Sequence, residues 1–589
     1  MISLSHLNKV LVLIACITFS LLYPNLSEAK NSNTIALVMK SLSNPFFFKM
    51  EVGAREYAKD ENIPLEVFGL ENETETARQI SIVEDLISRN YGAIVIAPAD
   101  SIKLVKICKK AMEKGIVVIN IDNPFHKETM VQLGVSIPFV GSDNYAGAQM
   151  VGNYIKRKLK GHGRVLVIEG IRGVENADLR KKGFIESVTD NSQIEIVASE
   201  SANWHTEEAL ALTVNLLNTN KNIDAIFCAN DSMALGAMQA IDLLGMSQKI
   251  IVAGYDNIES VHTEIRNARI KATIEQHPEL MGKYGVKLAF NQLKGIKPPL
   301  YKSTPLDLIT YETFNKKVGF LISTLQNSFF SVLLEGAQEA ADLFGIELIP
   351  FDAKNEDARQ LTQMSMALSQ EFDLLVLNAT DSESISTGIE LSNNAGIPVI
   401  TVDRKVSDGK VLCHIESDNV QGCRIAADMM VQHLGGKGKI LELEGIPGTS
   451  AAYERGSGFN EEIRKFSKIN VAFREVADFD RQEAKSVMLR YIRKNIFFDG
   501  VFAHNDHMIL GVVDAYESSE MKFPRVLIGF DAIPEAKKLI MAKKLTCTIA
   551  QKPKIMGKMA IEIAARYFRG ENIPPKQTVE LTLIEQEKE

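Results

Sequence analysis

The 589-residue chain has little cysteine, a single tryptophan and no excess of positive charge. Its 66 lysine and arginine residues are outnumbered by 74 aspartate and glutamate residues, which gives a formal net charge of -8. Because nucleic-acid binding needs a concentrated basic face, this balance argues against DNA or RNA as a partner. The hydrophobic share of 46% and the charged share of 24% are those of an ordinary globular protein, and they exclude a disordered or collagen-like chain.

The six cysteines show no CxxC pair and no cysteine–histidine spacing of the kind that binds zinc. Cys16 lies in an N-terminal apolar run that we expect to be removed on export. Five cysteines then remain, and because this number is odd, at least one thiol is unpaired. We expect the remaining cysteines to be small buried apolar residues: Cys108, Cys228, Cys413, Cys423 and Cys547. The sequence also lacks a Walker phosphate loop and an HExxH motif, which argues against an ATPase and a zinc protease. We expect no metal and no cofactor.

Residues 1–29 have the pattern of a secretory signal peptide. The apolar run Val10–Leu22 is interrupted only by two hydroxyl residues, and Ser27-Glu28-Ala29 places small residues where signal peptidase reads them. The run is short for a bilayer span of roughly 20 residues. An alternative stays open, because Leu13-Ile14-Ala15-Cys16 resembles a lipoprotein box in which Cys16 would carry lipid. We therefore expect a periplasmic protein, attached to a membrane only if Cys16 is lipidated.

The rest of the chain is duplicated. Asn230-Asp231-Ser232-Met233 recurs 275 residues later as Asn505-Asp506-His507-Met508, and Gly254-Tyr255-Asp256 recurs at the same offset as Gly529-Phe530-Asp531. Arg180 and Arg455 are related in the same way. A repeat of this length is a duplicated domain and not a solenoid period. We expect residues 30–312 to form one module and residues 313–589 a second.

Within each module, short apolar runs alternate with amphipathic stretches. Residues 318–322 and 374–377 read as buried strands, and residues 328–343 between them have apolar residues at helical spacing. This alternation predicts α/β modules with parallel sheets covered on both faces. Each module should have two doubly wound lobes, joined by a hinge of three chain crossings. Ligands of such sheets bind beyond the carboxyl ends of the strands.

In the second module the residues after successive strands are planar hydrogen-bonding groups and aromatic rings. They are Ser323, Asn327, Phe329, Phe330, Asn378, Asp403, Arg404, Arg455, Phe479, Asn505, Phe530, Asp531 and Gln551. Carboxylate, amide and guanidinium groups can each engage two neighbouring hydroxyls, and aromatic rings pack on the C–H face of a sugar. Taken singly, each residue has a commoner structural role as a cap, a core residue or a surface ion pair. Their joint position at strand ends favours a site for a neutral polyol.

The second module resembles the ribose-binding branch of the periplasmic sugar-binding proteins of bacterial ABC importers. The resemblance extends from Lys317 to about Gln586. The stretches that carry it include Thr401-Val402-Asp403-Arg404, Ala477-Asp478-Phe479-Asp480-Arg481 and Gly529-Phe530-Asp531. It implies that Phe329, Phe330 and Phe479 sandwich a pyranose ring. One departure is Ser328, where that family has proline.

The first module is similar to the allose-binding branch of the same superfamily, on the stretches Lys40-Ser41-Leu42-Ser43-Asn44-Pro45-Phe46 and Cys228-Ala229-Asn230-Asp231. The resemblance implies a sugar site made of Lys40, Asn44, Phe46, Phe47, Asp122, Asn123, Arg180, Trp204, Asn230, Tyr255, Asp256 and Gln276. Lys40 stands where the second module has Ser323, and Trp204 stands where it has Phe479. We therefore expect a different or broader aldopyranose, a hexose, in this cleft.

The sequence therefore predicts an exported, non-enzymatic binding protein that captures monosaccharides for an ABC sugar permease. A glycosidase would need a carboxylate pair with one raised pKa, and Asp403 and Asp531 could mimic such a pair. We expect neighbouring arginines to keep both carboxylates ionised, which suits the holding of hydroxyls. The alternative partner is a chemoreceptor or a sensor kinase to which the protein presents its sugar.

Overall fold

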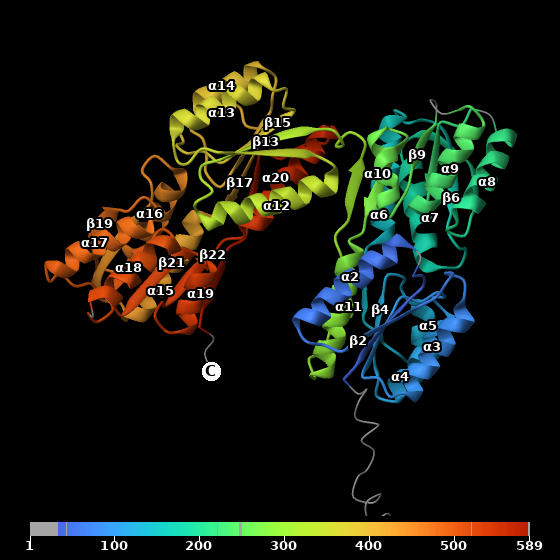
Figure 1. The fold of residues 1–589 in the computed structure, drawn as a ribbon, viewed down its shortest axis with the longest axis horizontal. Coiled ribbons are helices and arrows are strands. Elements are labelled where there is room, and N and C mark those ends of the chain that lie inside the picture. The colour runs from blue at the N-terminus through green and yellow to red at the C-terminus, as the bar shows by residue number, and fades with distance from the viewer. Residues whose placement is uncertain (1–32, 43, 221, 247–249, 520, 587–589) are drawn as a thin grey trace, which may run out of the picture. The chain divides into compact units, whose positions relative to one another are not determined.

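The computed structural model describes residues 33–586, apart from residues 43, 221, 247–249 and 520 (Figure 1). The predicted signal peptide and Cys16 lie outside the described residues. The chain divides into two compact units, and the first ends at Tyr311 while the second begins at Glu312. We call them module 1 and module 2. Each contains two six-stranded sheets, and each sheet forms the centre of one lobe.

The first lobe of module 1 has a wholly parallel sheet in the order β11-β5-β4-β3-β1-β2. Helices α2 and α11 pack together on one face, although more than 200 residues separate them, and α3 and α4 pack on the other (Figure 1). The elements are β1 (Ile35–Met39), α2 (Pro45–Asp60), β2 (Leu65–Gly69), α3 (Thr76–Ser88), β3 (Ala93–Ile96), α4 (Lys103–Glu113), β4 (Val117–Ile121), α5 (Lys127–Leu133), β5 (Phe139–Gly141), α11 (Pro278–Leu293) and β11 (Tyr301–Ser303).

The second lobe of module 1 has the order β12-β10-β9-β8-β6-β7, in which only β12 is antiparallel to its neighbour. Helix α6 pairs with α7, and α8 pairs with α9. The elements are α6 (Asn144–Lys158), β6 (His162–Glu169), α7 (Glu175–Thr189), β7 (Gln193–Ser201), α8 (Thr206–Thr219), β8 (Ala225–Cys228), α9 (Asp231–Leu243), β9 (Ile251–Ala253), α10 (Glu259–Arg266), β10 (Ile270–Glu275) and β12 (Asp307–Thr310).

The first lobe of module 2 repeats the parallel plan, in the order β14-β13-β15-β16-β17-β23. Helices α12 and α20 lie side by side on one face, and α13 and α14 lie on the other (Figure 1). The elements are β13 (Lys317–Ile322), α12 (Ser328–Phe344), β14 (Glu347–Asp352), α13 (Asp357–Ser369), β15 (Leu374–Leu377), α14 (Ser386–Asn394), β16 (Val399–Val402), β17 (Cys413–Ser417), α20 (Pro553–Phe568) and β23 (Lys576–Val579).

The second lobe of module 2 has the order β19-β18-β20-β21-β22-β24, with β24 antiparallel to β22. Apolar side chains of α17, α18 and α19 form a core on one face, and those of α15 and α16 form a core on the other. The elements are α15 (Asn419–Leu434), β18 (Gly438–Glu444), α16 (Ser450–Ile463), β19 (Ile469–Val476), α17 (Arg481–Arg493), β20 (Gly500–Ala503), α18 (Asp506–Ser519), β21 (Val526–Asp531), α19 (Pro534–Met541), β22 (Cys547–Ala550) and β24 (Thr582–Glu585).

The chain passes between the two lobes of each module three times. In module 1 the crossings lie between β5 and α6, between β10 and α11, and between β11 and β12. In module 2 they lie between β17 and α15, between β22 and α20, and between β23 and β24. The predicted two-lobed parallel α/β architecture is confirmed in both modules.

Near-continuous burial explains why the central strands are so apolar. Every residue of β1 and β3 is buried, as parallel strands covered by helices on both faces require. The five described cysteines are free and buried, three of them in β8, β17 and β22. None of the helices formed by the described residues is both long enough and apolar enough to cross a bilayer.

Candidate functional site

A cavity lies between the two lobes of each module. The module 2 cavity is lined by Asn327, Phe329, Phe330, Asp403, Arg404, Ala451, Arg455, Phe479, Asn505, Asp531 and Gln551. The module 1 cavity is lined by Lys40, Asn44, Phe46, Phe47, Glu73, Asp122, Asn176, Arg180, Trp204, Asn230 and Asp256.

In module 2, the second lobe contributes a buried arginine held from several sides. Arg455 donates to Asn419 Oδ1 at 3.0 Å and to the carbonyl oxygen of His504 at 2.6 Å. Its guanidinium lies 4.0 Å from the ring centroid of Phe530 and 3.7 Å from the carboxylate of Asp531. A guanidinium fixed in this way presents its remaining N–H groups in one direction, as recognition of a polar ligand requires.

The first lobe of module 2 contributes a second charged pair. Arg404 Nη1 donates to the carbonyl oxygen of Ala379 at 2.9 Å, and its Nε lies 3.9 Å from Asp403 Oδ2. Asn378 Nδ2 donates to the same carboxylate oxygen at 3.3 Å. Both Asp403 and Arg404 are at least 94% buried. The cavity is therefore lined by two carboxylates and two guanidinium groups, with no net charge.

Aromatic rings from the two lobes flank the module 2 cavity. Phe329 and Phe330 begin α12 and meet edge to face, with ring centroids 5.2 Å apart. Phe479, from the second lobe, lies directly on Gly445 at the end of β18, where a Cβ atom would come within 2.0 Å of its ring. Phe479 has a φ of 58°, a backbone conformation that non-glycine residues adopt mainly where structure demands it.

Asparagine caps orient two cavity residues in each module. Asn327 Oδ1 accepts from the N–H of Phe329, and Asn505 Oδ1 accepts from the N–H of Met508. Asn44 and Asn230 cap α2 and α9 in the same way. Because capping uses the side-chain oxygen, it fixes the amide plane and leaves the NH₂ group as the remaining donor.

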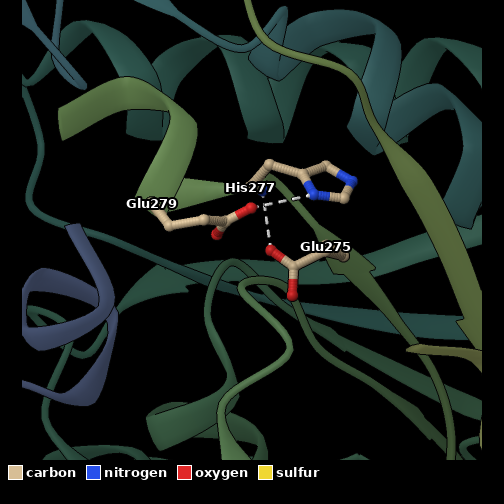
Figure 2. Close-up of side chains that lie close together, drawn as sticks. All are labelled: Glu275, His277 and Glu279. Carbon is tan, nitrogen blue, oxygen red and sulfur yellow. Dashed lines mark hydrogen bonds and ion pairs between the residues drawn. The ribbon is translucent and has the colours of Figure 1, made fainter. Parts of the chain in front are cut away.

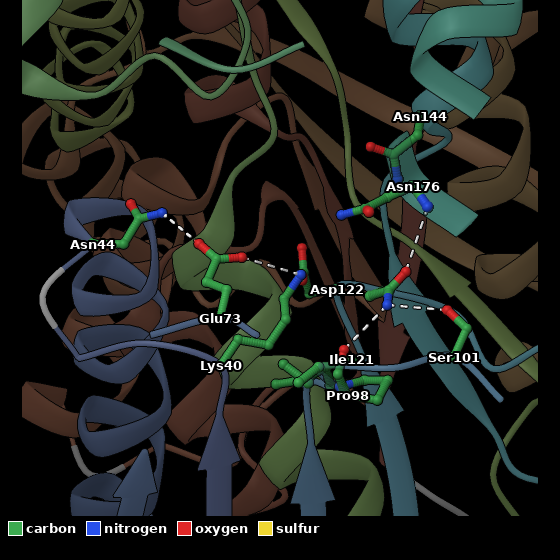
Figure 3. Close-up of polar contacts among 12 residues, drawn as sticks. Lys40, Asn44, Glu73, Pro98, Ser101, Ile121, Asp122, Asn144 and Asn176 are labelled. Atoms are coloured by element: carbon green, nitrogen blue, oxygen red, sulfur yellow. Dashed lines mark hydrogen bonds and ion pairs between the residues drawn. The ribbon is translucent and has the colours of Figure 1, made fainter. Parts of the chain in front are cut away.

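The first lobe of module 1 has a charged network with no counterpart among the described residues of module 2 (Figure 3). Lys40 Nζ lies 3.0 Å from Asp122 Oδ2 and 3.6 Å from Glu73 Oε2, and Asn44 Nδ2 donates to Glu73 Oε1 at 3.1 Å. Lys40 and Asp122 are both at least 97% buried. Burial acts to lower the pKa of Lys40, but the two carboxylates outweigh it and the pKa is raised.

The second lobe of module 1 repeats the module 2 arrangement. Arg180 donates to Asn144 Oδ1 at 2.7 Å and to Asp256 Oδ1 at 3.0 Å, and its guanidinium lies 3.9 Å from the ring centroid of Tyr255. Trp204 has a φ of 70° and packs on Gly170, as Phe479 does on Gly445.

Six of the predicted site residues lie behind the cavity walls. Tyr255 and Phe530 support the arginines, and Gln276 donates to Asp256 while accepting from Ser142. Asn123 Nδ2 donates to the carbonyl oxygen of Pro98 and to Ser101 Oγ. Asn378 contacts Asp403, and the buried hydroxyl of Ser323 has no hydrogen-bond partner in the described part of the chain.

Three cavity residues are absent from the sequence-based set. Asn176 and Ala451 are related by the 275-residue offset, and each lies one helical turn before the cavity arginine of α7 or α16. Helical spacing from Arg180 and Arg455 could have found both. Glu73 lies in a loop between β2 and α3 and not at a strand end of the repeat pattern. No sequence signal points to it.

Burial raises the pKa of Asp531, Asp256 and Asp403 more than the arginines lower it. The pKa of Asp531 is raised to about 6, with Arg455 acting against the shift. The pKa of Asp256 is raised to about 7, because Asp122 and Glu73 add to the effect of burial while Arg180 opposes it. The pKa of Asp403 is also raised. The sequence predicts that the arginines keep these carboxylates ionised. They do so only in part, because desolvation raises each pKa more than the arginines lower it.

The hinge of module 1 contains a group of possible metal ligands, Glu275, His277 and Glu279 (Figure 2). His277 Nδ1 lies 3.2 Å from Glu279 Oε1, and Nε2 lies 2.7 Å from Asp307 Oδ2. Burial acts to lower the pKa of His277, but these carboxylates raise it to about 9. A histidine with both ring nitrogens facing carboxylates is an imidazolium donor, whereas a metal needs a neutral ring. The geometry therefore favours an ion pair over a metal centre.

Comparison with known proteins identifies the family. A model of the periplasmic binding protein domain matches residues 35–297 and again residues 318–572. The chain belongs to the periplasmic binding protein family. It is a tandem fusion of two type I modules, each of which provides its own two lobes and its own cavity.

Several relatives span about half of the chain. A D-ribose/D-allose-binding protein of Pseudomonas aeruginosa is 39% identical over 311 residues, which cover 52% of this chain and 97% of that protein. The ribose import binding protein of Escherichia coli is 38% identical and covers 45% of this chain and 90% of its own length. A solved ABC transporter periplasmic solute binding protein from Actinobacillus succinogenes, with bound D-allose, is 35% identical, covers 47% of this chain and 98% of its own, and has a TM-score of 0.46.

Proposed function

We propose that each module binds one monosaccharide in its cavity and that the loaded protein delivers it to an ABC sugar permease. The observation that carries the proposal is the composition of the cavities. Aromatic rings from both lobes line each cavity together with buried bidentate groups. A sugar ring has two C–H faces and a rim of hydroxyls, which match rings above and below and polar groups at the edge.

Buried polar atoms without partners support a polar ligand. Gln551 Oε1 in module 2 and Trp204 Nε1 in module 1 have no hydrogen-bond partner among the described residues, and both residues line their cavities. Such atoms are costly unless something pairs with them. A sugar hydroxyl can donate to the first and accept from the second.

The two cavities fit different sugars. For module 2 we propose a ribose-like aldopyranose, supported by its resemblance to ribose-binding proteins and by its uncharged balance of two aspartates and two arginines. For module 1 we propose an allose-like hexose, because Trp204 offers a wider ring and Lys40 and Glu73 add a donor and an acceptor. Buried groups that pair with particular hydroxyls reject a wrong epimer strongly, since it leaves them unpaired.

The relatives named above are binding and import proteins, which supports a periplasmic, non-enzymatic role. Binding from both lobes would favour a closed form that a permease recognises. The predicted signal peptide of residues 1–29 is consistent with export. We place the two sugar-binding modules at residues 30–312 and 313–589.

Calorimetric titration of the mature chain with D-ribose, D-allose, D-glucose and D-galactose tests the binding step. We expect two independent sites, one that prefers ribose and one that prefers allose. Binding of none of these sugars would contradict the proposal. Uptake of labelled sugar by cells that lack the gene tests the import step, and unchanged uptake with lost chemotaxis would point to a sensory receptor instead.

A further inference from the structure

Each module has a buried aspartate next to the cavity that does not line it. Asp231 is the first residue of α9 and Asp506 is the first residue of α18, and each directly follows a cavity asparagine. Both aspartates are fully buried. Burying a carboxylate is unfavourable unless hydrogen bonds satisfy it, so its partners indicate what it does.

In module 2, both carboxylate oxygens of Asp506 accept hydrogen bonds that lead to the turn after Asp531. The N–H of Ile533 donates to Oδ2 at 2.9 Å, and the hydroxyl of Thr548 donates to Oδ1 at 2.7 Å. The N–H of Ala532 in turn donates to that threonine hydroxyl at 3.3 Å. Asp506 thus holds two successive backbone N–H groups of the turn, that of Ile533 directly and that of Ala532 through Thr548.

Module 1 has the same arrangement with different turn residues. The N–H of Ile258 donates to Asp231 Oδ2 at 3.0 Å, and the hydroxyl of Thr273 donates to Oδ1 at 2.8 Å. The N–H of Asn257 donates to Thr273 Oγ1 at 3.2 Å. The turn residue is Asn257 in module 1 and Ala532 in module 2, and the hydrogen bonds are the same in both. The network therefore does not depend on which residue occupies the turn.

The turns held in this way have an unfavourable backbone conformation. Asp531 has a φ of 111° and Ala532 a φ of 57°, and the corresponding angles of Asp256 and Asn257 are 106° and 51°. Non-glycine residues with positive φ persist only where the surrounding structure holds them. The turn sets the direction of Asp531 and Asp256, whose carboxylates line the cavities.

A glycine lies against each of these buried carboxylates. A Cβ atom at Gly529 would lie 2.1 Å from Asp506 Oδ1, and one at Gly254 would lie 2.1 Å from Asp231 Oδ1. The glycine two residues before each cavity aspartate therefore provides the space into which the buried carboxylate fits.

We propose that Asp231 and Asp506, each with its threonine, are positioning residues that hold the strained turn and thereby aim the cavity carboxylates Asp256 and Asp531 at the ligand. The ligand assignment rests on the proposed function, whereas the positioning of the turn does not.

The test uses the full chain with Asp506→Ala, Thr548→Val and Thr548→Ser, measuring ribose affinity by calorimetry and amide hydrogen exchange of Ala532 and Ile533. We expect Asp506→Ala to weaken ribose binding at least about tenfold, and Thr548→Val roughly threefold to tenfold, because each removes hydrogen bonds from the turn. Thr548→Ser keeps the hydroxyl and should restore both the affinity and the slow exchange of Ala532. Should Asp506→Ala fail to fold, the two threonine variants decide the question.

Thr546→Val is the matched control, because Thr546 also binds a backbone N–H of β21, that of Leu527, but at the opposite end of the strand from Asp531. Its ribose affinity should stay at the wild-type value. Wild-type affinity and wild-type exchange in folded Thr548→Val would overturn the inference. If the wild-type chain binds no monosaccharide, the proposed function fails separately. Amide exchange alone then decides the inference, with faster exchange in Thr548→Val but not in Thr548→Ser supporting it.

Discussion

Modules 1 and 2 share most of the residues that line their cavities and differ most in the charged partners that their first lobes provide. In the second lobes, Arg180 and Arg455 bind the same kinds of partner, and Asp256 and Asp531 lie on the same strained turn. In the first lobes, Asp403 has Arg404 as its cationic neighbour, whereas Asp122 pairs with Lys40, which also faces Glu73. After the duplication, the cavity aspartates of both lobes were kept, and the cation of the first lobe changed its position.

The difference begins in one loop. Residues 70–75 connect β2 to α3, whereas the shorter stretch 353–356 connects β14 to α13. The longer loop brings Glu73 into the cavity, so module 1 has three lining carboxylates against two cations. The extra negative charge contributes to the higher pKa of Asp256 relative to Asp531. A loop of two more residues thus changes the electrostatics of a carboxylate on the opposite lobe.

The hinges differ as well. His277 of module 1 bridges Glu279 of α11, in the first lobe, and Asp307 of β12, in the second. At the repeat offset, module 2 has Lys552, Lys554 and Thr582 at these positions. Only module 1 therefore has an imidazolium between two carboxylates at this crossing.

The largest effect expected is that of removing one cavity arginine. Arg455→Ala removes a cavity guanidinium and leaves the cavity carboxylate of Asp531 without its cationic neighbour, so ribose binding should weaken more than about 100-fold. Arg180→Ala should do the same to allose binding only, as measured by calorimetry. Arg424→Ala is the control, because that arginine pairs with Glu461 on the surface. Loss of both sugars in either cavity variant would show that the modules do not bind independently.

The hinge comparison predicts a stability difference. The pKa of His277 is about 9 in the folded chain against an ordinary value near 6.5, so its stabilisation is fully present below pH 6.5 and disappears as the pH rises through about 9. His277→Gln should lower the free energy of unfolding of module 1 by on the order of 2–3 kcal/mol at pH 6 and by little at pH 10. Urea denaturation at both pH values measures it, with Lys552→Gln as the module 2 control. An equal loss at both pH values would contradict an imidazolium role.

A smaller effect should distinguish the first-lobe walls. Lys40→Met leaves Asp122 and Glu73 facing each other without their cation, and we expect allose affinity to fall roughly tenfold to 100-fold. Ser323→Ala changes the corresponding position of module 2, where the hydroxyl has no partner among the described residues, and ribose affinity should change by less than about threefold. Calorimetry of both variants gives the comparison. A Ser323→Ala effect as large as that of Lys40→Met would mean that the two walls are equivalent.

The smallest effect concerns acidification. The cavity carboxylate accepts sugar hydroxyls in its ionised form, so binding should weaken by up to about tenfold for each pH unit below its pKa. Allose binding should begin to fall near pH 7 and ribose binding near pH 6. Glu73→Gln removes a negative charge that raises the pKa of Asp256, and it should move the onset for allose towards that for ribose. Identical pH profiles of the two sugars in the wild-type chain would contradict this account.

The repeat, the strand-end rule and the family resemblance together predicted most of the residues that line both cavities. Ten of the thirteen residues predicted for module 2 and nine of the twelve predicted for module 1 line the cavity of their module. The others, such as Tyr255 and Gln276, lie directly behind the lining residues. Strand ends mark the correct edge of a sheet, but they do not show which of two adjacent side chains faces the ligand and which supports it.

The sequence by itself determined the duplication, the parallel α/β class and the edge at which polar and aromatic residues gather, because these depend on periodicity and on local order along the chain. Only the tertiary structure decided that Glu73 enters the module 1 cavity, that His277 bridges two lobes and that Asp506 holds the turn of Asp531. Each of these depends on residues distant in sequence that meet across a loop or a chain crossing. Burial, which sets the pKa of Asp256 and Asp531, likewise exists only once both lobes are packed.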